Sequence, residues 1–165
     1  MTELPHIDRS AVFKRFVGNR QASSAVEFAI VALPVLMLMM GVVQIGIYYI
    51  AQSSLDTGVI KTAELLRTNF TTGTTATLTP ASTLKANVAT AGGGMIQNNA
   101  NLAVEVRDFS TLTAASVPIV DGTTDYGTNT STIVLRAQAT VPTLAPGLGA
   151  LTTIRSSAMI RRQGT

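Results

Sequence analysis

Glu27 is the first candidate for a functional side chain. It stands directly before Phe28–Leu55, a long run without a formal charge, and it follows the basic residues Lys14, Arg15 and Arg20. A carboxylate at the edge of a membrane helix costs free energy unless a cation pairs with it, so such a residue is a functional candidate by default. The alternative is that Glu27 is a plain interfacial charge on an ordinary membrane anchor.

Two further groups of polar residues are weaker candidates. One resembles part of a calcium loop but lacks the alternating acidic spacing, which favours an ordinary hairpin loop; it consists of Asp121, Asp125, Gly127 and Asn129. The other is a set of arginines near the end of the chain, interpreted as solvated strand-end charges or, alternatively, as a partner-binding set; it consists of Arg155, Arg161 and Arg162. We expect no metal and no cofactor.

The residues for catalysis are missing from the part of the sequence that follows the apolar run. The only histidine, His6, precedes that run, and the chain has no cysteine. Glu105 and Asp108 stand three residues apart on an expected strand and would point to opposite faces. A serine or threonine nucleophile needs a nearby base, and Lys61 and Lys85 lie in polar surroundings. We therefore expect that the protein is not an enzyme.

The apolar run predicts a single membrane span. Phe28–Ile50 alone would form a helix of about 34 Å, against a hydrocarbon core about 30 Å thick. A cleavable secretory signal has a shorter apolar region of about 7–15 residues. Pro34 can be absorbed in such a helix as a kink. Because the segment before the span is net positive, the N-terminus is expected in the cytoplasm and everything after about Ala51 outside.

The overall charge supports this topology and argues against a nucleic-acid partner. The chain has 165 residues, a formal net charge of +3 and a pI of about 9.7. The basic excess marks the segment before the span, while the charges after the span nearly balance, so no basic patch for nucleic acid is expected. Without cysteine, the outer domain must be held together by its core and by packing on its helix.

The sequence predicts an α+β fold, with a long helix against a small antiparallel sheet. One helix is expected from near Ala22 to Thr68, and beyond the membrane it becomes amphipathic. Its apolar stripe consists of Leu55, Val59, Ala63 and Leu66. The Thr-rich segment Asn69–Pro80 is expected to be a loop or short edge strand.

A second, shorter helix is expected from Ala81 to about Ala91, with Pro80 and Ser82 marking its start. Gly92–Gly94 is expected to be a flexible connection that prevents the helix from continuing toward Gln97.

Three later segments alternate at period two, and each predicts a half-buried strand. They cover residues 102–107, 133–141 and 154–161. Val117–Val120 is a candidate for a further strand, and Asp121-Gly122 supplies a turn signal.

Residues 22–34 resemble the start of the type IV pilins. A small residue, four further residues, then Glu27 and Phe28, and a hydrophobic helix with the early proline Pro34 form this pattern. Together with the Gly46–Tyr49 region and the closing Ile154–Arg162 pattern, it is most similar to TadE-like minor pilins, or pseudopilins, of the tight-adherence (Flp) pilus. The resemblance is specific over residues 18–68, and beyond them only the order of helix and strands matches.

The resemblance implies a chain that is cut by a prepilin peptidase. The cut would fall between Ala22 and Ser23 and leave Glu27 as the fifth residue of the mature chain; Ala22 stands where pilins usually have glycine. Glu27, Phe28 and Pro34 would then serve assembly. The new ammonium of Ser23 would lie within reach of a neighbour's Glu27, and an ion pair in low dielectric would fix the register between packed helices.

The resemblance also implies a location and partners. The chain would cross the bacterial inner membrane once, with a cytoplasmic leader at 1–22, a spine helix at 23–68 and a periplasmic domain at 69–165. The implied partners are the prepilin peptidase, other pilins and minor pilins, the inner-membrane assembly platform and the lipid bilayer. The alternative is an uncleaved, membrane-anchored periplasmic protein that binds a pilus or secretion assembly partner.

Overall fold

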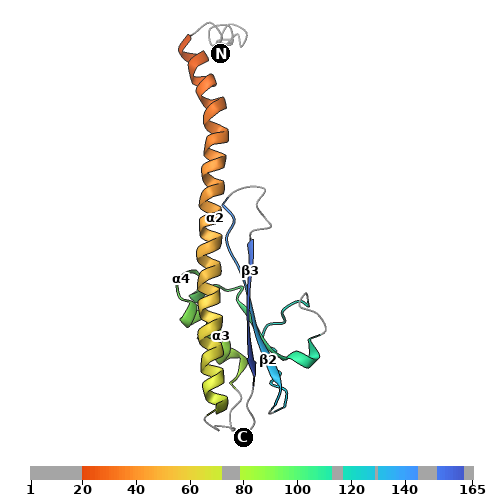
Figure 1. Cartoon of the computed structure of the whole chain (residues 1–165). Helices are drawn as coiled ribbons and strands as arrows, with labels where there is room; N and C mark the ends of the chain where they lie inside the picture. Colours follow the sequence, from red (N-terminus) through yellow and green to blue (C-terminus); the bar gives the residue numbers. More distant parts are fainter. Residues whose placement is uncertain (1–19, 72–78, 113–116, 129, 145–151, 162–165) are drawn as a thin grey trace, which may run out of the picture. The chain divides into compact units, whose positions relative to one another are not determined.

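The computed structural model describes residues 20–71, 79–112, 117–128, 130–144 and 152–161 (Figure 1). The chain divides into two compact units, Met1–Val42 and Val43–Thr165. The described elements are, in order, α2 (Arg20–Thr71), α3 (Ala81–Gly92), α4 (Gly94–Gln97), β1 (Ala103–Asp108), η1 (Phe109–Thr111), β2 (Thr132–Thr140) and β3 (Thr153–Arg161). The predicted α+β class is confirmed.

Helix α2 is slightly longer at both ends than the helix expected from the sequence. Pro34 lies inside it and does not end it, because the loss of one backbone hydrogen bond is tolerated in a long apolar helix. The helix runs three residues into the segment expected to be a Thr-rich loop. The rest of that loop up to residue 78, and residues 1–19 of the expected leader, lie outside the described residues.

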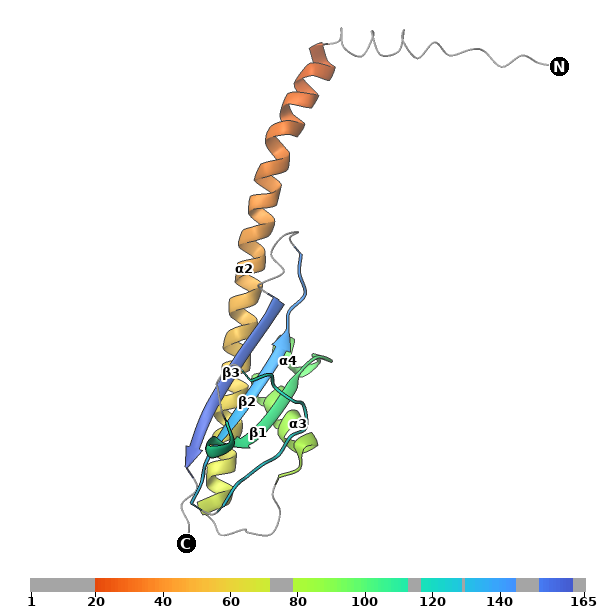
Figure 2. The same ribbon diagram turned by 90° about the vertical axis from the view of Figure 1, so that its right-hand side faces the viewer.

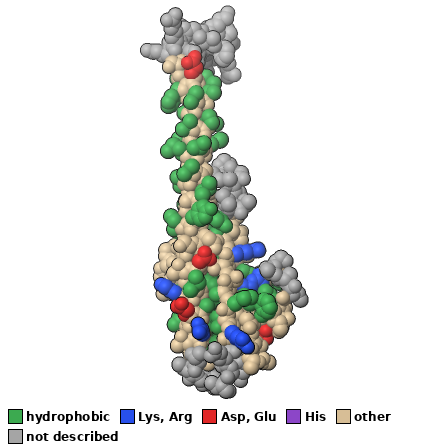
Figure 3. Space-filling view, in the orientation of Figure 1, with side chains coloured by type: hydrophobic (Ala, Val, Ile, Leu, Met, Phe, Trp, Pro, Cys, Tyr) green, Lys and Arg blue, Asp and Glu red, His purple; other side chains and the backbone are tan. Residues whose placement is uncertain are grey.

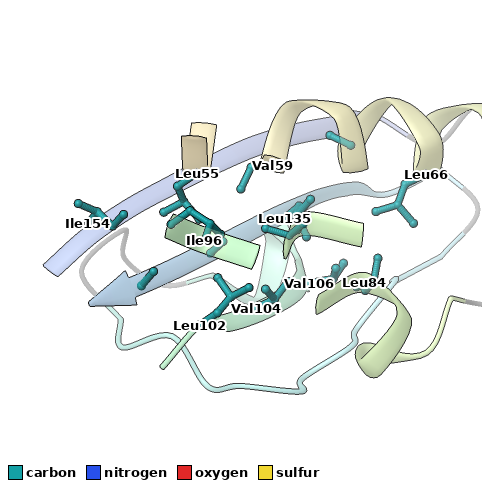
Figure 4. Packing of buried hydrophobic residues seen from close by; sticks show 14 of the residues in the cluster. Leu55, Val59, Leu66, Leu84, Ile96, Leu102, Val104, Val106, Leu135 and Ile154 are labelled. Atoms are coloured by element: carbon teal, nitrogen blue, oxygen red, sulfur yellow. The ribbon is translucent and has the colours of Figure 1, made fainter. Parts of the chain in front are cut away.

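The core of the second unit forms where α2 packs on the inner face of the sheet. The predicted stripe is confirmed, with exposed fractions of 0% for Leu55 and Val59, 8% for Ala63 and 2% for Leu66. Figure 4 shows Leu55, Val59 and Leu66 of this stripe beside Leu84 of α3, Ile96 of α4 and inner residues of the strands, among them Val104, Val106 and Leu135. Burying each large aliphatic side chain contributes about 1.5–3 kcal/mol.

The three strands form an antiparallel sheet in the order β1-β2-β3 (Figure 2). The register places Val106 of β1 opposite Leu135 of β2, and Leu135 opposite Ala158 of β3. All three predicted strands are present, each within one or two residues of its expected bounds. The inward residues are buried as the alternation predicted.

The outer face of the sheet differs from the expectation of half-buried strands. On β3 the expectation is correct, since Arg155 and Met159 are exposed. On β1 and β2 it is wrong, because Glu105 is 0% and Arg136 only 6% exposed. The segment after η1 lies over them: the amide of Val120 donates to Glu105 Oε2 at 2.9 Å. A period-two pattern cannot show that a second layer of chain covers its polar face.

Val117–Val120 is not a strand, and that expectation is wrong. The chain immediately after it instead runs along the outer edge of β1 through backbone hydrogen bonds. The amide of Gly122 donates to Val104, the amide of Val106 donates to Thr123, and the amide of Asp125 donates to Val106. The predicted Asp121-Gly122 turn is confirmed, with a positive φ of 81° at Gly122. The edge of β1 is thereby closed, while β3 is the other edge of the sheet.

The glycines at 92–94 do not form the flexible connection that the sequence suggested. Gly92 ends α3, Gly94 begins α4, and Gly93 joins the two helices with a φ of 59°. The helix expected from Ala81 to about Ala91 is confirmed as α3, with Pro80 as its N-cap and no side-chain hydrogen bond at that cap.

Candidate functional site

The first half of α2 exposes an almost continuous apolar surface. Phe28, Ile30 and Leu38 are 74%, 68% and 69% exposed, and the side chains in green in Figure 3 show the same character along this part of the helix. The other large exposed apolar residues of this half, residues 20–45, are Val26, Val31, Leu33, Val35, Leu36, Met37, Met39, Met40, Val42, Val43 and Ile45. A helix that is apolar all round must be covered by lipid or by protein.

Helix α2 is the one helix in the described part of the chain that is long and apolar enough to cross a membrane. The candidate span falls within Ser24–Phe70, and its most apolar window has a mean hydropathy of 2.4. Only 6% of that window is buried inside the structure, whereas the core helix of a globular protein would be largely buried. The part of the sequence expected to span the membrane is therefore also the part that the fold leaves uncovered.

The sequence-predicted site residues all lie on the first half of α2. Glu27 has an exposed side chain directly before Phe28, and Pro34 is exposed one to two turns later. Ala22 and Ser23 belong to the helical backbone, and their side chains lie outside the described residues. Because Ser23 and Glu27 are four residues apart in a helix, they share one face on successive turns.

Gln44 is a buried polar residue within the apolar run, and sequence reasoning missed it. Its side chain is 0% exposed. Nε2 donates to the carbonyl of Pro142 at 3.2 Å, and Oε1 accepts from the amide of Leu144 at 2.7 Å. Its signal in the sequence was the single amide side chain within Phe28–Ile50, the apolar front part of the uncharged run.

Glu105 forms the centre of a buried ion-pair network on the outer face of the sheet. Arg136 stands directly opposite it on β2, with Nη1 at 2.9 Å from Oε1, and Arg107 Nε donates to Oε2 at 3.2 Å. The Arg136 contact is a close approach of charges rather than an aligned hydrogen bond. Arg136 Nη2 also donates to the carbonyl of Val117. The network fastens the segment at 117–120 to the sheet, which is a structural role.

Asp108 belongs to a hydrogen-bond network separate from that of Glu105, which agrees with the expectation that the two acids point to opposite faces of the strand. Its Oδ1 accepts from the amide of Ser110 at 2.9 Å, and its Oδ2 accepts from Ser131 Oγ at 2.8 Å. The hydrogen bond from the Ser110 amide, followed by that from Ser131, lowers the pKa of Asp108. The two acids share no hydrogen-bond partner among the described residues.

The acids of the supposed calcium loop are engaged in contacts within the fold. Asp121 pairs with Lys85 at 2.7 Å and accepts from the amide of Val104 at 3.0 Å. Burial alone would raise the pKa of Asp121, but the hydrogen bond from Lys85 and that from Val104 outweigh it and lower the pKa. Asp125 accepts from the amide of Gly127 at 3.0 Å. Asn129 lies outside the described residues.

Two of the three arginines near the end of the chain, Arg155 and Arg161, lie on β3, at an edge of the sheet. Arg155 Nε donates to Gln138 Oε1 at 2.9 Å, Arg161 is exposed, and Arg162 lies outside the described residues. Between α2 and β3 lies an open groove of about 400 Å³. Its lining residues are Ile60, Ala63, Glu64, Arg67, Ala158, Met159, Ile160 and Arg161.

Comparison with known families gives one match. The model of the TadE-like protein family matches residues 22–63, which include the first half of α2 and part of the stripe that packs on the sheet. The resemblance expected from the sequence is confirmed over this segment. No curated protein and no solved structure matches the chain.

Proposed function

Because the TadE-like family model matches the helix that carries Glu27, we propose that this chain is a minor pilin, or pseudopilin, of a tight-adherence pilus. It is stored in the bacterial inner membrane with its leader in the cytoplasm and its α+β domain in the periplasm. Its action is assembly, through packing of α2 against the helices of other pilins. The observation that carries this proposal is the apolar, exposed first half of α2 with one acid at its start.

A helix that is apolar on every side suits both environments that a pilin meets. In the membrane its side chains contact lipid, and in a fibre the same side chains contact neighbouring helices. The exchange of lipid for protein contacts carries little hydrophobic cost, because lipid tails are as apolar as leucine. Specific contacts must therefore select the arrangement of the helices.

Glu27 supplies such a contact once the leader is removed. Cleavage by a prepilin peptidase between Ala22 and Ser23 creates an ammonium group one helical turn before Glu27. In a packed fibre the ammonium of one subunit reaches the Glu27 carboxylate of the next. An ion pair in a low-dielectric setting fixes the axial register of the two helices.

The experiment is Glu27→Gln, with Glu64→Gln as the matched control on the same helix. Glu64 is exposed and lies beyond the apolar run. Leaving one charge of a buried pair without its partner costs about 3–5 kcal/mol, so piliation of Glu27→Gln should fall at least about tenfold at unchanged protein abundance. Glu64→Gln should assemble normally. Pili are counted by electron microscopy, and subunit contacts are measured by crosslinking to other pilins.

A second candidate function rests on the groove between α2 and β3. An uncleaved membrane-anchored protein could bind a pilus or secretion assembly partner there, using the open edge of β3. Wild-type piliation in Glu27→Gln together with a loss in Glu64→Gln would favour this candidate. The pilin proposal requires the opposite result.

A further inference from the structure

The connection from β2 to β3 is fastened to α2 at a position within the expected membrane span. A span needs about 20 apolar residues, and about 20 residues counted from Phe28 reach Ile47. Gln44 therefore lies three residues before the end of such a span, near its outer boundary. The hydrogen-bond partners of the Gln44 side chain are the carbonyl of Pro142 and the amide of Leu144, at the start of the β2–β3 connection. A turn of the outer domain thus contacts the helix at membrane depth.

Several backbone groups at and beside this turn are satisfied or absent, which lowers the cost of an apolar environment. Gln44 satisfies the Pro142 carbonyl and the Leu144 amide, Pro142 has no N–H, and the amide of Val141 donates to the carbonyl of Thr152 at 2.6 Å. Irregular backbone is tolerated at membrane depth only where its polar groups are satisfied by protein or face a water-filled cavity. The Gln44 amide supplies both partners at once.

The exposed side chains around Gln44 carry no charge and, apart from Thr143, are apolar or aromatic. Leu144 is 55% exposed, and on the helix Ile45, Tyr49 and Ile50 are 45%, 67% and 62% exposed. The helix carries no charge between Glu27 and Asp56, and the strand connection carries none between Arg136 and Arg155. Tyr48 and Tyr49 form an edge-to-face pair at a ring distance of 5.9 Å, and tyrosine is enriched at membrane–water interfaces.

We propose that the turn Pro142–Leu144 enters the outer boundary of the lipid bilayer beside α2, with Leu144 in contact with lipid. Lipid is the expected partner because this surface is continuous with the expected span and because neither the helix nor the strand connection carries a charge there. The inference rests on the proposed membrane location of α2. It gives the α+β domain a second membrane contact, so the domain is held against the bilayer at a fixed rotation about α2.

The absence of cysteine makes a direct test possible in the full chain. Single cysteines replace Leu144, Leu36 and Met159, each carries a nitroxide label, and the protein is placed in phosphatidylcholine–phosphatidylglycerol vesicles. Electron paramagnetic resonance then compares collisions with oxygen, which enriches in lipid, and with a nickel chelate, which stays in water. Met159 is 63% exposed on β3 and serves as the water-facing reference.

The label at Leu144 should match the label at Leu36, with an oxygen-to-nickel ratio several-fold above that at Met159. A Leu144 label as nickel-accessible as Met159, with Leu36 still in lipid, would overturn the lipid contact alone. Protection of Leu144 from both reagents would also overturn it, since another protein surface would then cover the turn. Nickel access at Leu36 would overturn the proposed membrane location, and the inference with it.

Two glutamine variants test the mechanism in the Leu144-labelled chain. Gln44→Leu removes both hydrogen bonds to the turn and should move the label into water. Gln52→Leu is the matched control, because Gln52 also donates to a strand backbone, the carbonyl of Arg155 at 2.9 Å. The control should leave the label in lipid. An unchanged label in Gln44→Leu would contradict the role of Gln44 in holding the turn.

Discussion

Glu105 and Gln44 are two buried polar side chains whose burial is stabilised by the groups that they contact. Glu105 is tolerated at full burial because Arg136 faces it across the strands and Arg107 lies beside it. Gln44 is tolerated at full burial because its side-chain amide donates a hydrogen bond to the carbonyl of Pro142 and accepts one from the amide of Leu144. Glu27 was recognisable from the sequence, since its cost follows from the neighbouring apolar run. The other two were not, because their partners are distant in the chain.

The cleavage proposed at Ala22 and Ser23 gives a prediction at the same scale. A peptidase that cuts here must admit a small side chain beside the scissile bond. Ala22→Phe should therefore block the cut, whereas Ala22→Gly should be cut at least as well as the natural chain. Intact mass spectrometry of protein recovered from membranes, with the cognate peptidase co-expressed, measures the result.

Full-length protein from the natural chain, under conditions where the major pilin is fully processed, would contradict the cleavage. Equal processing of the Ala22→Phe and Ala22→Gly variants would show that the enzyme does not read this position. Both outcomes would favour the uncleaved anchor over the pilin.

At the scale of elements, the periodicity of the sequence predicted those features that depend on neighbouring residues in the chain. The buried stripe of α2 and the three strands followed from spacings of 3.6 and 2 residues. The cover over β1 and β2 did not, because the segment at 117–125 is ordered by contacts to strand edges rather than by its own pattern. The join at Gly93 was missed for a similar reason, since glycine-rich sequence signals a break without saying that packing fixes it.

The contact between α2 and α3 gives a prediction about packing. A Cβ atom at Gly58 would lie 2.5 Å from the carbonyl oxygen of Val88, and one at Gly92 would lie 2.8 Å from that of Ser54. Both obstacles are backbone atoms, so the helices must separate. Gly58→Ala should therefore destabilise the domain by about 1–3 kcal/mol, the usual cost of overpacking.

Gly46→Ala is the matched control, because nothing lies within 4 Å of a Cβ at that position of the same helix. Chemical unfolding of the full chain in detergent, followed by circular dichroism, should show a lower midpoint for Gly58→Ala and no loss for Gly46→Ala. Equal midpoints for the two variants would mean that the helices are not in close contact at Gly58.

For the whole molecule, the two halves of α2 differ in how much of their apolar surface is exposed. Its first half is apolar on all sides, and its second half is apolar only where it meets the sheet. The family match covers residues 22–63, so the comparison covers most of α2 and none of the sheet. The groove beside β3 is formed by residues of α2 and β3 that are distant in the chain. The pattern of the sequence therefore did not predict it.

The proposed topology is tested on the intact chain. The basic residues before the span should hold the N-terminus in the cytoplasm, so protease added to spheroplasts should digest the chain beyond Ala51 and leave the leader intact. An epitope tag at each end follows the two halves by immunoblot, and lysed spheroplasts provide the control in which both tags are lost. Protection of the C-terminal tag in intact spheroplasts would reverse the orientation and place the α+β domain away from any pilus. Replacing Lys14, Arg15 and Arg20 by glutamine should weaken the orientation, with a larger share of the C-terminal tag becoming protected, because the positive charges are what retain the leader.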